Sequence, residues 1–122
     1  MAKQTFGTAQ SPLSPAVRAG DFVFVSGQVP VGADGKVVAG GIETETRQVL
    51  ENVKAALALA GARMEDVVKT TVWLRDAGDF AAMNGVYRTF FPSEPPARST
   101  VESRLMIDIA VEIEAVAFAP RG

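Results

Sequence analysis

Dense clusters of aromatic and β-branched residues predict four strands along the chain. The first cluster, residues 21–26, closes on Gly27, where we expect the chain to turn. A second strand is predicted over residues 67–74, and two more end the chain at 99–104 and 110–119. Single Gly and Pro residues separate these segments, and they do not cluster into an interdomain linker. The pattern therefore favours one domain that contains a sheet.

Two segments carry apolar residues at helical spacing. The longer one follows the pair 40–41 and ends before Gly61, which we expect to cap its C-terminus; its apolar positions are Ile42, Val49, Leu50, Val53, Leu57 and Ala60. A shorter helix is predicted over residues 79–90, with Asp79 as its N-cap. Between the first strand and the first helix, an Asp-Gly pair within residues 33–36 predicts a tight hairpin turn.

The last predicted strand has large apolar groups on both of its faces. Alternation puts one set of residues on one face (Val111, Ile113, Ala115 and Ala117) and a second set on the other (Glu112, Glu114, Val116 and Phe118). Two amphipathic helices cover only one side of a sheet, so the other side needs a partner. We therefore expect one α+β domain over residues 1–122, a mixed sheet with two helices on one face and copies of the same chain packed on the other in a closed symmetric oligomer.

Composition narrows the chemistry that this domain can perform. The chain has 122 residues, 48% of them hydrophobic, with 12 Lys plus Arg against 14 Asp plus Glu. It contains neither His nor Cys, which excludes most zinc sites, a cysteine nucleophile and a Ser-His-Asp relay. The net charge of −2 gives no general attraction to nucleic acid, which becomes a secondary hypothesis. Since no segment is apolar enough for a signal peptide or a bilayer span, we expect a cytoplasmic protein without a membrane partner.

Two charged residues are set in unusual surroundings. Arg98 follows the stiff segment 91–97, whose prolines constrain the backbone that delivers it. A guanidinium is always charged and offers two parallel donors to a carboxylate. Glu112 lies on the strand face that also carries large apolar groups, where a carboxylate invites a partner charge. The structural alternatives are an ordinary ion pair for Arg98, and a Glu112 that neutralises Arg98 or Arg104 across an interface.

Six short motifs occur in order over nearly the whole chain: Ser26-Gly27-Gln28-Val29-Pro30, Arg47-Gln-Val-Leu-Glu-Asn-Val-Lys54, Val68-Lys-Thr-Thr-Val72, Asp79-Phe80 with Asn84 and Tyr87, Pro96-Ala-Arg-Ser99, and Glu112-Ile-Glu-Ala115. Together they resemble the RidA/YjgF family of enamine and imine deaminases, whose relatives also carry the labels endoribonuclease L-PSP and translation initiation inhibitor. The resemblance implies a chorismate-mutase-like α+β fold and a homotrimer with a central barrel. It also implies three ligand clefts, each between neighbouring subunits.

The resemblance assigns roles to five positions. Arg98 matches the family arginine that holds a substrate carboxylate, and Glu112 matches the glutamate that positions or activates water. Ser26 and Asn84 match residues that line the cleft; a strand end for Ser26 and a packing or capping role for Asn84 are the structural alternatives. Leu13 stands where members commonly have the tyrosine of Gly-Pro-Tyr, which closes the cleft over the ligand, so that an apolar lid replaces a hydrogen-bonding one.

Two further positions depart from the family pattern. Thr100 replaces a cysteine of the best-known members, which removes a reactive thiol that imine hydrolysis does not need. Leu105-Met106 lacks the proline often found there. The change at Leu13 bears on substrate preference more than on reaction type. We expect a divergent branch of the family.

The resemblance implies an enzyme that hydrolyses small 2-imino or 2-enamino acids to 2-keto acids and ammonia. Arg98 would clamp the carboxylate and Glu112 would position water, with no metal or organic cofactor required. Two alternatives remain open. One is a module that binds keto acids without turning them over. The other is an endoribonuclease or translation inhibitor. The net negative charge and the absence of histidine disfavour this alternative.

Overall fold

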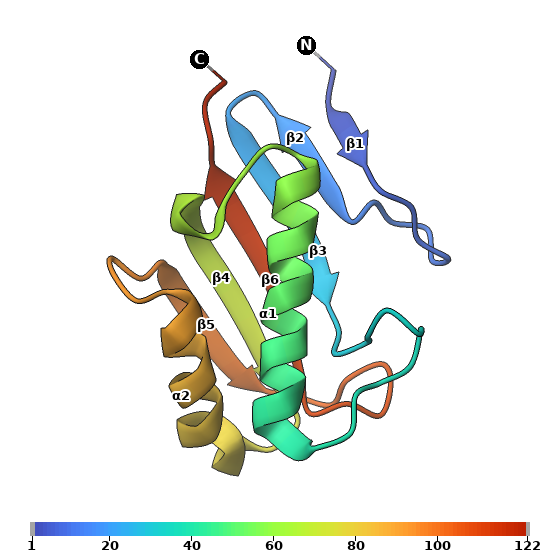
Figure 1. The fold of residues 1–122 in the computed structure, drawn as a ribbon, viewed down its shortest axis with the longest axis vertical. Coiled ribbons are helices and arrows are strands. Elements are labelled where there is room, and N and C mark those ends of the chain that lie inside the picture. The colour runs from blue at the N-terminus through green and yellow to red at the C-terminus, as the bar shows by residue number, and fades with distance from the viewer. Residues whose placement is uncertain (1, 122) are drawn as a thin grey trace.

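A six-stranded mixed sheet with two helices on one face makes up the computed structural model, which describes residues 2–121 (Figure 1). The strands are β1 (Gln4–Phe6), β2 (Ala16–Ala19), β3 (Phe22–Gln28), β4 (Val67–Leu74), β5 (Ala97–Glu102) and β6 (Val111–Phe118). The helices are α1 (Gly41–Leu59) and α2 (Phe80–Phe90), with short 3-10 turns η1 (Met64–Asp66) and η2 (Ala77–Asp79). The α+β architecture expected from the sequence is confirmed.

Strand order explains why both helices lie on the same face. The order is β1-β2-β3-β6-β4-β5, and every neighbouring pair is antiparallel except β4 and β5. Parallel neighbours need a crossover connection, which α2 supplies between β4 and β5. The other helix, α1, crosses over β6 to connect β3 with β4 (Figure 1). The opposite face of the sheet receives no helix.

The core lies between α1 and the middle of the sheet. The alternation predicted for the last strand is confirmed, because its four inward residues are buried: Val111, Ile113, Ala115 and Ala117. They belong to one cluster with the buried apolar positions predicted for α1, which include Val49, Leu50, Val53 and Leu57. Gly61 is left-handed, with φ of 81°, and the Ala62 N–H donates to the Leu57 carbonyl at 2.9 Å. The predicted C-terminal cap is therefore confirmed.

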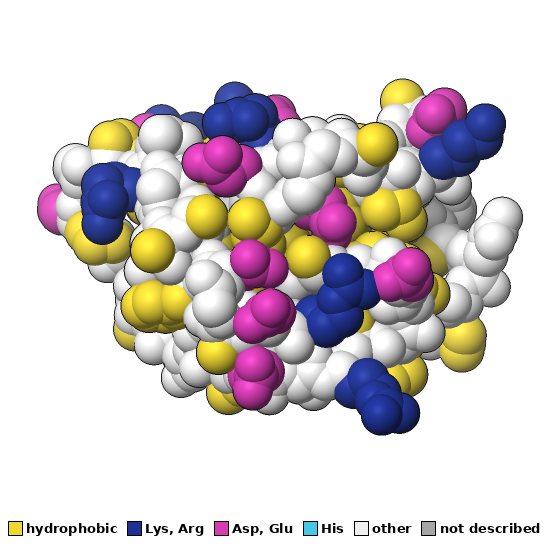
Figure 2. Space-filling view, turned by 90° about the horizontal axis from the view of Figure 1, so that it is seen from below, with side chains coloured by type: hydrophobic (Ala, Val, Ile, Leu, Met, Phe, Trp, Pro, Cys, Tyr) yellow, Lys and Arg dark blue, Asp and Glu magenta, His cyan; other side chains and the backbone are white. Residues whose placement is uncertain are grey.

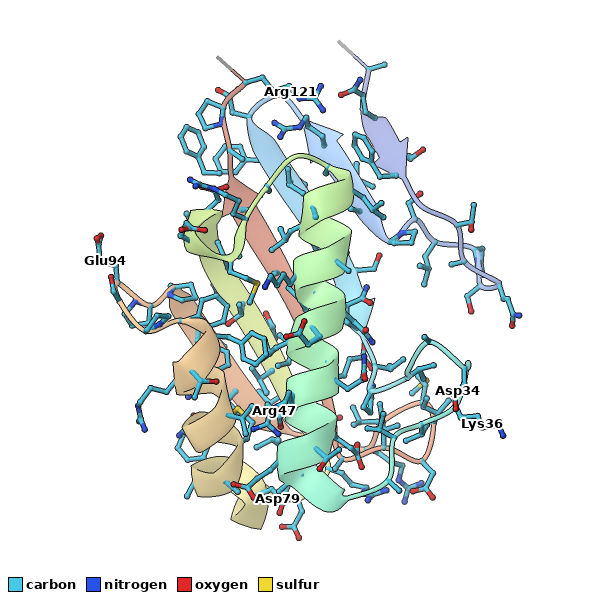
Figure 3. All side chains as sticks on the ribbon, viewed as in Figure 1. Asp34, Lys36, Arg47, Asp79, Glu94 and Arg121 are labelled. Carbon is cyan, nitrogen blue, oxygen red and sulfur yellow. The ribbon has the colours of Figure 1, made fainter. Side chains whose placement is uncertain are left out.

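Three local predictions are confirmed only in part. The first strand does not end at Gly27 but runs to Gln28 with a shift of register against β6, so Gly27 marks an irregularity inside a strand. Asp79 is the N-cap residue of α2, as predicted, but its side chain makes no capping hydrogen bond. The Asp76 side chain accepts from the Gly78 N–H at 2.8 Å and opens η2, which leads into α2. The turn at 33–36 forms and joins the antiparallel pair Val31 and Val37, but this bridge does not extend into two strands; Asp34 and Lys36 mark the tip of the turn in Figure 3.

Strands β1 and β2 were not expected from the sequence. The centre of β2 is Arg18, a residue type typical of solvent-exposed surface, yet this side chain is only 3% exposed. Its guanidinium donates to the carbonyls of Ala60 and Ala119, both at 2.8 Å. Arg18 thereby joins β2 to the end of α1 and to the chain after β6. These bonds depend on the tertiary fold, so local patterning does not signal them.

The sheet face without helices is apolar, as the sequence predicted. Phe22, Phe24 and Phe118 are 43%, 45% and 44% exposed, and the rings of Phe22 and Phe118 meet edge to face at 5.2 Å. Val101 on β5 is similarly exposed. Large apolar side chains gathered on one face are typical of an interaction surface.

Charged side chains of both signs are mixed over the surface. Figure 2 shows acidic and basic groups interspersed with apolar ones at the end of the molecule seen from below. Within residues 2–121, no helix combines the length and the apolar character that crossing a bilayer requires. In the same stretch, no three acidic side chains gather in an arrangement suited to a metal ion.

Candidate functional site

Arg98 lies on the edge strand β5, beneath α2, where it is partly buried. Its Nη1 donates to the Asn84 Oδ1 at 2.8 Å. The guanidinium also lies over two rings, 4.7 Å from the centre of Tyr87 and 5.6 Å from that of Phe80. Aromatic faces attract a cation without consuming its N–H donors. Arg98 is therefore held in place while most of its donors stay available.

The ring under Arg98 is itself fixed. The hydroxyls of Tyr87 and Thr70 are 2.7 Å apart in a buried hydrogen bond. Burial raises the pKa of Tyr87 above its ordinary value, although the bond to Thr70 and the charge of Arg98 oppose that rise. The phenol thus stays neutral at physiological pH. Arg98 and Asn84 line a cavity of about 280 Å³ with Tyr87 and the proline pair 95–96.

The ion pairs in the described part of the chain belong to Arg63 and Arg75, and none involves Arg98. Within one copy, Arg98 is therefore not an ordinary ion-pair residue. The Arg98 guanidinium is always charged, has no carboxylate partner within one copy, and lies on aromatic rings beside a cavity. It is therefore suited to bind an anion.

Glu112 lies on the other face of the sheet, near the start of β6. It contributes to a cavity of about 670 Å³ with Leu13 and other residues of the N-terminal loop, the segment 27–29, Asn52, and the pair 106–107. Within residues 2–121, the Glu112 carboxylate accepts no hydrogen bond from a protein group. Burial raises the pKa of this carboxyl, and the charge of Glu114 raises it further. A carboxylate that faces a cavity and has no donor partner in the protein is suited to accept a proton from water.

Gly27 makes room for that carboxylate. A Cβ added at Gly27 would lie 2.1 Å from the Glu112 Oε2, which is far inside van der Waals contact. Gly27 does not have the positive φ that favours glycine elsewhere, so space alone requires glycine here. The sequence analysis missed this role. The only local signal was a glycine within an apolar strand.

The Ser26 hydroxyl is used inside the protein. It donates to the Ser14 carbonyl at 2.6 Å, and the Ser26 N–H donates to the Pro15 carbonyl at 3.0 Å. Ser26 thereby ties the N-terminal loop to the end of β3, and its neighbours Gly27 and Gln28 line the cavity instead. This geometry corresponds to the structural alternative considered for Ser26.

Asn52 on α1 is a second residue that the sequence analysis did not single out. Its Nδ2 donates to the carbonyls of Val29 and Val31, at 2.9 and 3.0 Å. Its Oδ1 accepts from Gln48 at 2.9 Å. Asn52 therefore fixes the wall of the Glu112 cavity from the helix side, although its amide is fully engaged and not free for a ligand.

The predicted site residues fall into two groups on opposite faces of the sheet. Thr70 pairs in register with both Ala115 and Arg98, which places Arg98 on the face covered by helices. Glu112 pairs with Trp73 on the uncovered face. Asn84 lies with Arg98, and Leu13 lies with Glu112. One copy of the chain thus carries two separate half-sites, and Arg98 and Glu112 do not meet within it.

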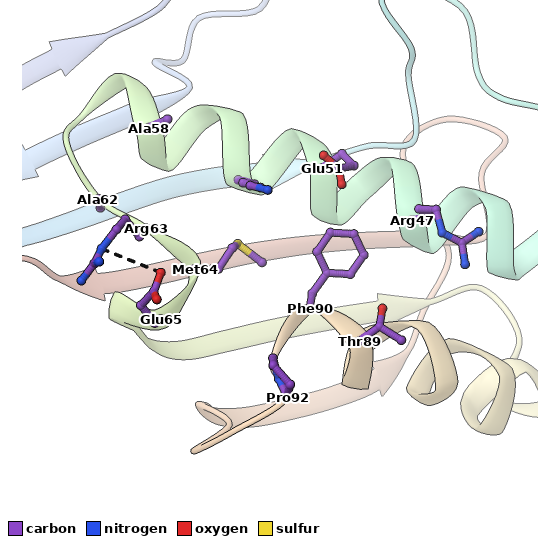
Figure 4. A pocket seen from close by; sticks show the side chains of 11 residues that line it. Arg47, Glu51, Ala58, Ala62, Arg63, Met64, Glu65, Thr89, Phe90 and Pro92 are labelled. Atoms are coloured by element: carbon purple, nitrogen blue, oxygen red, sulfur yellow. Dashed lines mark ion pairs between the residues drawn. The ribbon is translucent and has the colours of Figure 1, made fainter.

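A third hollow, of about 740 Å³, lies between α1 and α2 (Figure 4). Phe90 and Met64 form part of its wall, and Arg63 pairs with Glu65 at its edge at 3.8 Å. None of the predicted site residues lines it. Its charges are of both signs and exposed, so it shows no preference for one kind of ligand.

Comparison with known proteins agrees with the family resemblance. A family model described as Endoribonuclease L-PSP matches residues 4–119. A RutC family protein of Pyrococcus horikoshii is 50% identical over 109 residues, which is 88% of this chain and 86% of the relative. A 2-iminobutanoate/2-iminopropanoate deaminase of Salmonella typhimurium is 42% identical over 121 residues, covering 96% of this chain and 94% of the enzyme.

Solved structures agree as well. The crystal structure of Escherichia coli TdcF with bound serine superposes with a TM-score of 0.89 and is 38% identical, covering 98% of this chain and 99% of TdcF. Relatives at about this level of identity carry the name of an imine deaminase. The resemblance that six short motifs indicated is confirmed, and the chain belongs to the endoribonuclease L-PSP family, the family of the RidA and YjgF proteins.

Proposed function

We propose that this protein hydrolyses 2-imino acids, and the 2-enamino acids that tautomerise to them, to 2-keto acids and ammonia. The observation that carries the proposal is the contrast between two unpaired groups: a guanidinium with free donors at one cavity, and a carboxylate with raised pKa and no hydrogen-bond donor at another. The deaminase name of relatives that match almost the whole chain supports it. Serine bound to TdcF also supports it, because an amino acid carries the carboxylate that Arg98 is suited to hold.

The two groups divide the chemistry between them. Arg98 binds the substrate carboxylate and holds the C=N carbon in place. Glu112 accepts a proton from water as the water oxygen bonds to that carbon. Glu112 gives this proton to the nitrogen, which yields a carbinolamine with one hydroxyl and one amino group. Glu112 then accepts the hydroxyl proton and passes it to the amino group, so that the C=O bond forms, the C–N bond breaks and ammonia leaves a 2-keto acid behind. A raised pKa suits both steps, since the carboxyl gives its proton back more readily.

A complete site requires two copies of the chain. Arg98 and Glu112 lie on opposite faces of one sheet, which supports a site in which the Arg98 of one copy faces the Glu112 of another. The apolar face around Phe24 and Phe118 supplies the surface on which the copies pack. Three copies in a closed ring, as the family resemblance implies, would form three equal sites.

Phe24→Glu is expected to break up the oligomer, because it puts a charge into the packed face. Size-exclusion chromatography with light scattering should give a single-chain mass for the variant and a trimer mass for the wild type. Imine hydrolysis should fall at least tenfold with the loss of assembly. Leu59→Glu, on an equally exposed apolar residue of α1, is the control and should remain trimeric. An assembled, fully active Phe24→Glu protein would contradict the proposed packing.

Gly27→Ala is expected to lower kcat about 100-fold or more without unfolding the protein, because the added methyl displaces the Glu112 carboxylate. The matched control is Gly85→Ala on α2, where a Cβ meets nothing within 4 Å. That control should keep full activity and gain about 0.5–1 kcal/mol in stability from helix propensity. Steady-state kinetics and thermal unfolding of both variants check the prediction. Equal kinetics in the two would show that the contact with Glu112 is irrelevant.

The deciding experiment for the function is a coupled assay. An amino acid oxidase generates 2-imino acids in situ, and the release of ammonia and keto acid is followed with and without the protein. We expect the wild type to accelerate release and Arg98→Ala to abolish the gain. Unchanged rates together with tight keto-acid binding would instead identify a binding module, the alternative that the sequence left open.

A further inference from the structure

Three exposed apolar side chains surround the opening of the Glu112 cavity. Leu13, from the N-terminal loop, is 49% exposed, and Met106 and Ile107, from the segment between β5 and β6, are 91% and 47% exposed. We call these three residues the apolar rim. An isolated exposed leucine needs no explanation, but three large apolar groups from two distant segments at one cavity are typical of a binding surface.

The segment that carries Met106 and Ile107 is anchored at both ends. At one end the Ser103 N–H donates to the Leu74 carbonyl at 2.8 Å. At the other, the Ala110 N–H donates to the buried Glu45 carboxylate at 2.7 Å. Between these ends, Asp108 forms an ion pair with Arg75. The two ends of the segment that carries Met106 and Ile107 are therefore held by the fold.

Polarity changes from the inner wall of this cavity to its rim. The inner wall presents the Glu112 carboxylate against the Gly27 backbone, while the amide of Asn52 is engaged by the protein. The rim presents hydrocarbon and a thioether, and Thr8, Gln10 and Ser11 of the N-terminal loop add polar groups to the same lining. Because Glu112 and the rim line the same cavity, a ligand with its reacting carbon at Glu112 can place its side chain against the rim. The cavity of about 670 Å³ leaves room for a side chain much longer than methyl.

We propose that the apolar rim selects 2-imino acids with long apolar side chains, such as the imines of leucine, methionine and phenylalanine, over the imine of alanine. The inference rests on the proposed deaminase function and names its substrate class. Each additional methylene in an apolar pocket improves discrimination by about tenfold or more. The unbranched, flexible Met106 adapts to side chains of different shape. The imine of leucine should thus be preferred over that of alanine by at least about tenfold in kcat/KM.

The test compares those two imines, each generated in situ by an amino acid oxidase. In the wild type we expect the leucine-to-alanine ratio of kcat/KM to be about ten or higher, and in Ile107→Lys and Met106→Ser to approach one. Leu59→Lys, an equally exposed apolar residue on α1 outside this cavity, is the control and should keep the wild-type ratio. A wild-type ratio of one or below would overturn the proposal. So would rim variants that change oligomeric mass and lower both rates equally, because the rim would then be a subunit contact.

A binding measurement separates this inference from the function on which it rests. Trp73, the single tryptophan, pairs with Glu112 across β4 and β6, so its fluorescence can report ligands in this cavity. We expect 4-methyl-2-oxopentanoate to bind at least about tenfold more tightly than pyruvate, and Ile107→Lys to remove the difference. If no imine is hydrolysed but this preference holds, the rim is selective and the deaminase proposal fails. If imines are hydrolysed without any such preference, the deaminase proposal stands and the rim inference is overturned.

Discussion

Arg98→Ala is expected to lower kcat/KM for imine hydrolysis by about 10²- to 10³-fold, because it removes the charged donors that hold the substrate carboxylate. The loss should be mainly in binding. The dissociation constant of a 2-keto acid product should rise by a similar factor, since product and substrate share the carboxylate. Arg98→Lys should recover only part of the loss, because an ammonium lacks the planar pair of donors and packs less well over Tyr87.

The matched control for this prediction is Arg47→Ala. Arg47 is an exposed arginine of α1 that lines the hollow between the helices (Figure 4) and neither the Arg98 cavity nor the Glu112 cavity. It removes the same net charge and should leave the kinetics within about twofold of wild type, since exposed charges at this distance are screened by salt. Comparable losses in the two variants would assign the effect to net charge and contradict a specific role for Arg98. Steady-state kinetics and isothermal titration with a keto acid measure both quantities.

Glu112→Gln is expected to lower kcat by about 10²- to 10⁴-fold while leaving keto-acid affinity nearly unchanged. Glutamine keeps the size of the side chain but cannot accept a proton from water. Because burial raises the pKa of Glu112, the wild-type rate should fall on the acid side at a pH above the usual range of a glutamate. This acid limb should be absent from the residual activity of the variant. A variant with the wild-type pH profile would show that another group carries the proton.

The same substitution has a stability signature of opposite sign. The pKa of the Glu112 carboxyl is higher in the folded than in the unfolded state. Ionisation of this carboxyl therefore lowers the free energy of unfolding, which is a penalty on folding. That penalty is absent below the unfolded pKa and fully present above the folded one. Glu112→Gln should therefore melt at the same temperature as the wild type or higher at neutral pH, and the gain should vanish in acid. A less stable variant at neutral pH would mean that the carboxylate supports the fold.

Local patterning predicts the parts of this fold that depend on neighbours in sequence. The helical spacing around Val53 and the alternation along β6 are visible in the chain, and both are confirmed. Strand β2 was missed because its Arg18 is buried by carbonyls from residues 60 and 119, far away in sequence. A side chain satisfied only by the tertiary fold gives no local signal.

Some features of the candidate site could also be predicted from the sequence, and others depend on the assembled fold. Arg98, Glu112, Asn84 and Leu13 were found through the family motifs, and the structure gives Arg98 and Asn84 a direct contact. The separation of Arg98 from Glu112 could not be predicted, because it depends on which strands pair and in what register. The role of Gly27 likewise depends on the register shift between β3 and β6. Residue types can be read along the chain, but the face on which each lies follows from the assembled sheet.

The most direct test of a site shared between copies is complementation. Arg98→Ala and Glu112→Gln chains, each inactive alone, are co-expressed with different tags, and hybrid oligomers that carry both tags are purified and assayed. A site is intact when its Arg98 comes from a Glu112→Gln chain and its Glu112 comes from an Arg98→Ala chain. In a ring of three chains that contains both variants, one of the three sites meets this condition, so the purified hybrids should show about a third of the wild-type rate. Hybrids with no more activity than the parent variants would contradict the shared site, since each site would then draw both residues from one chain.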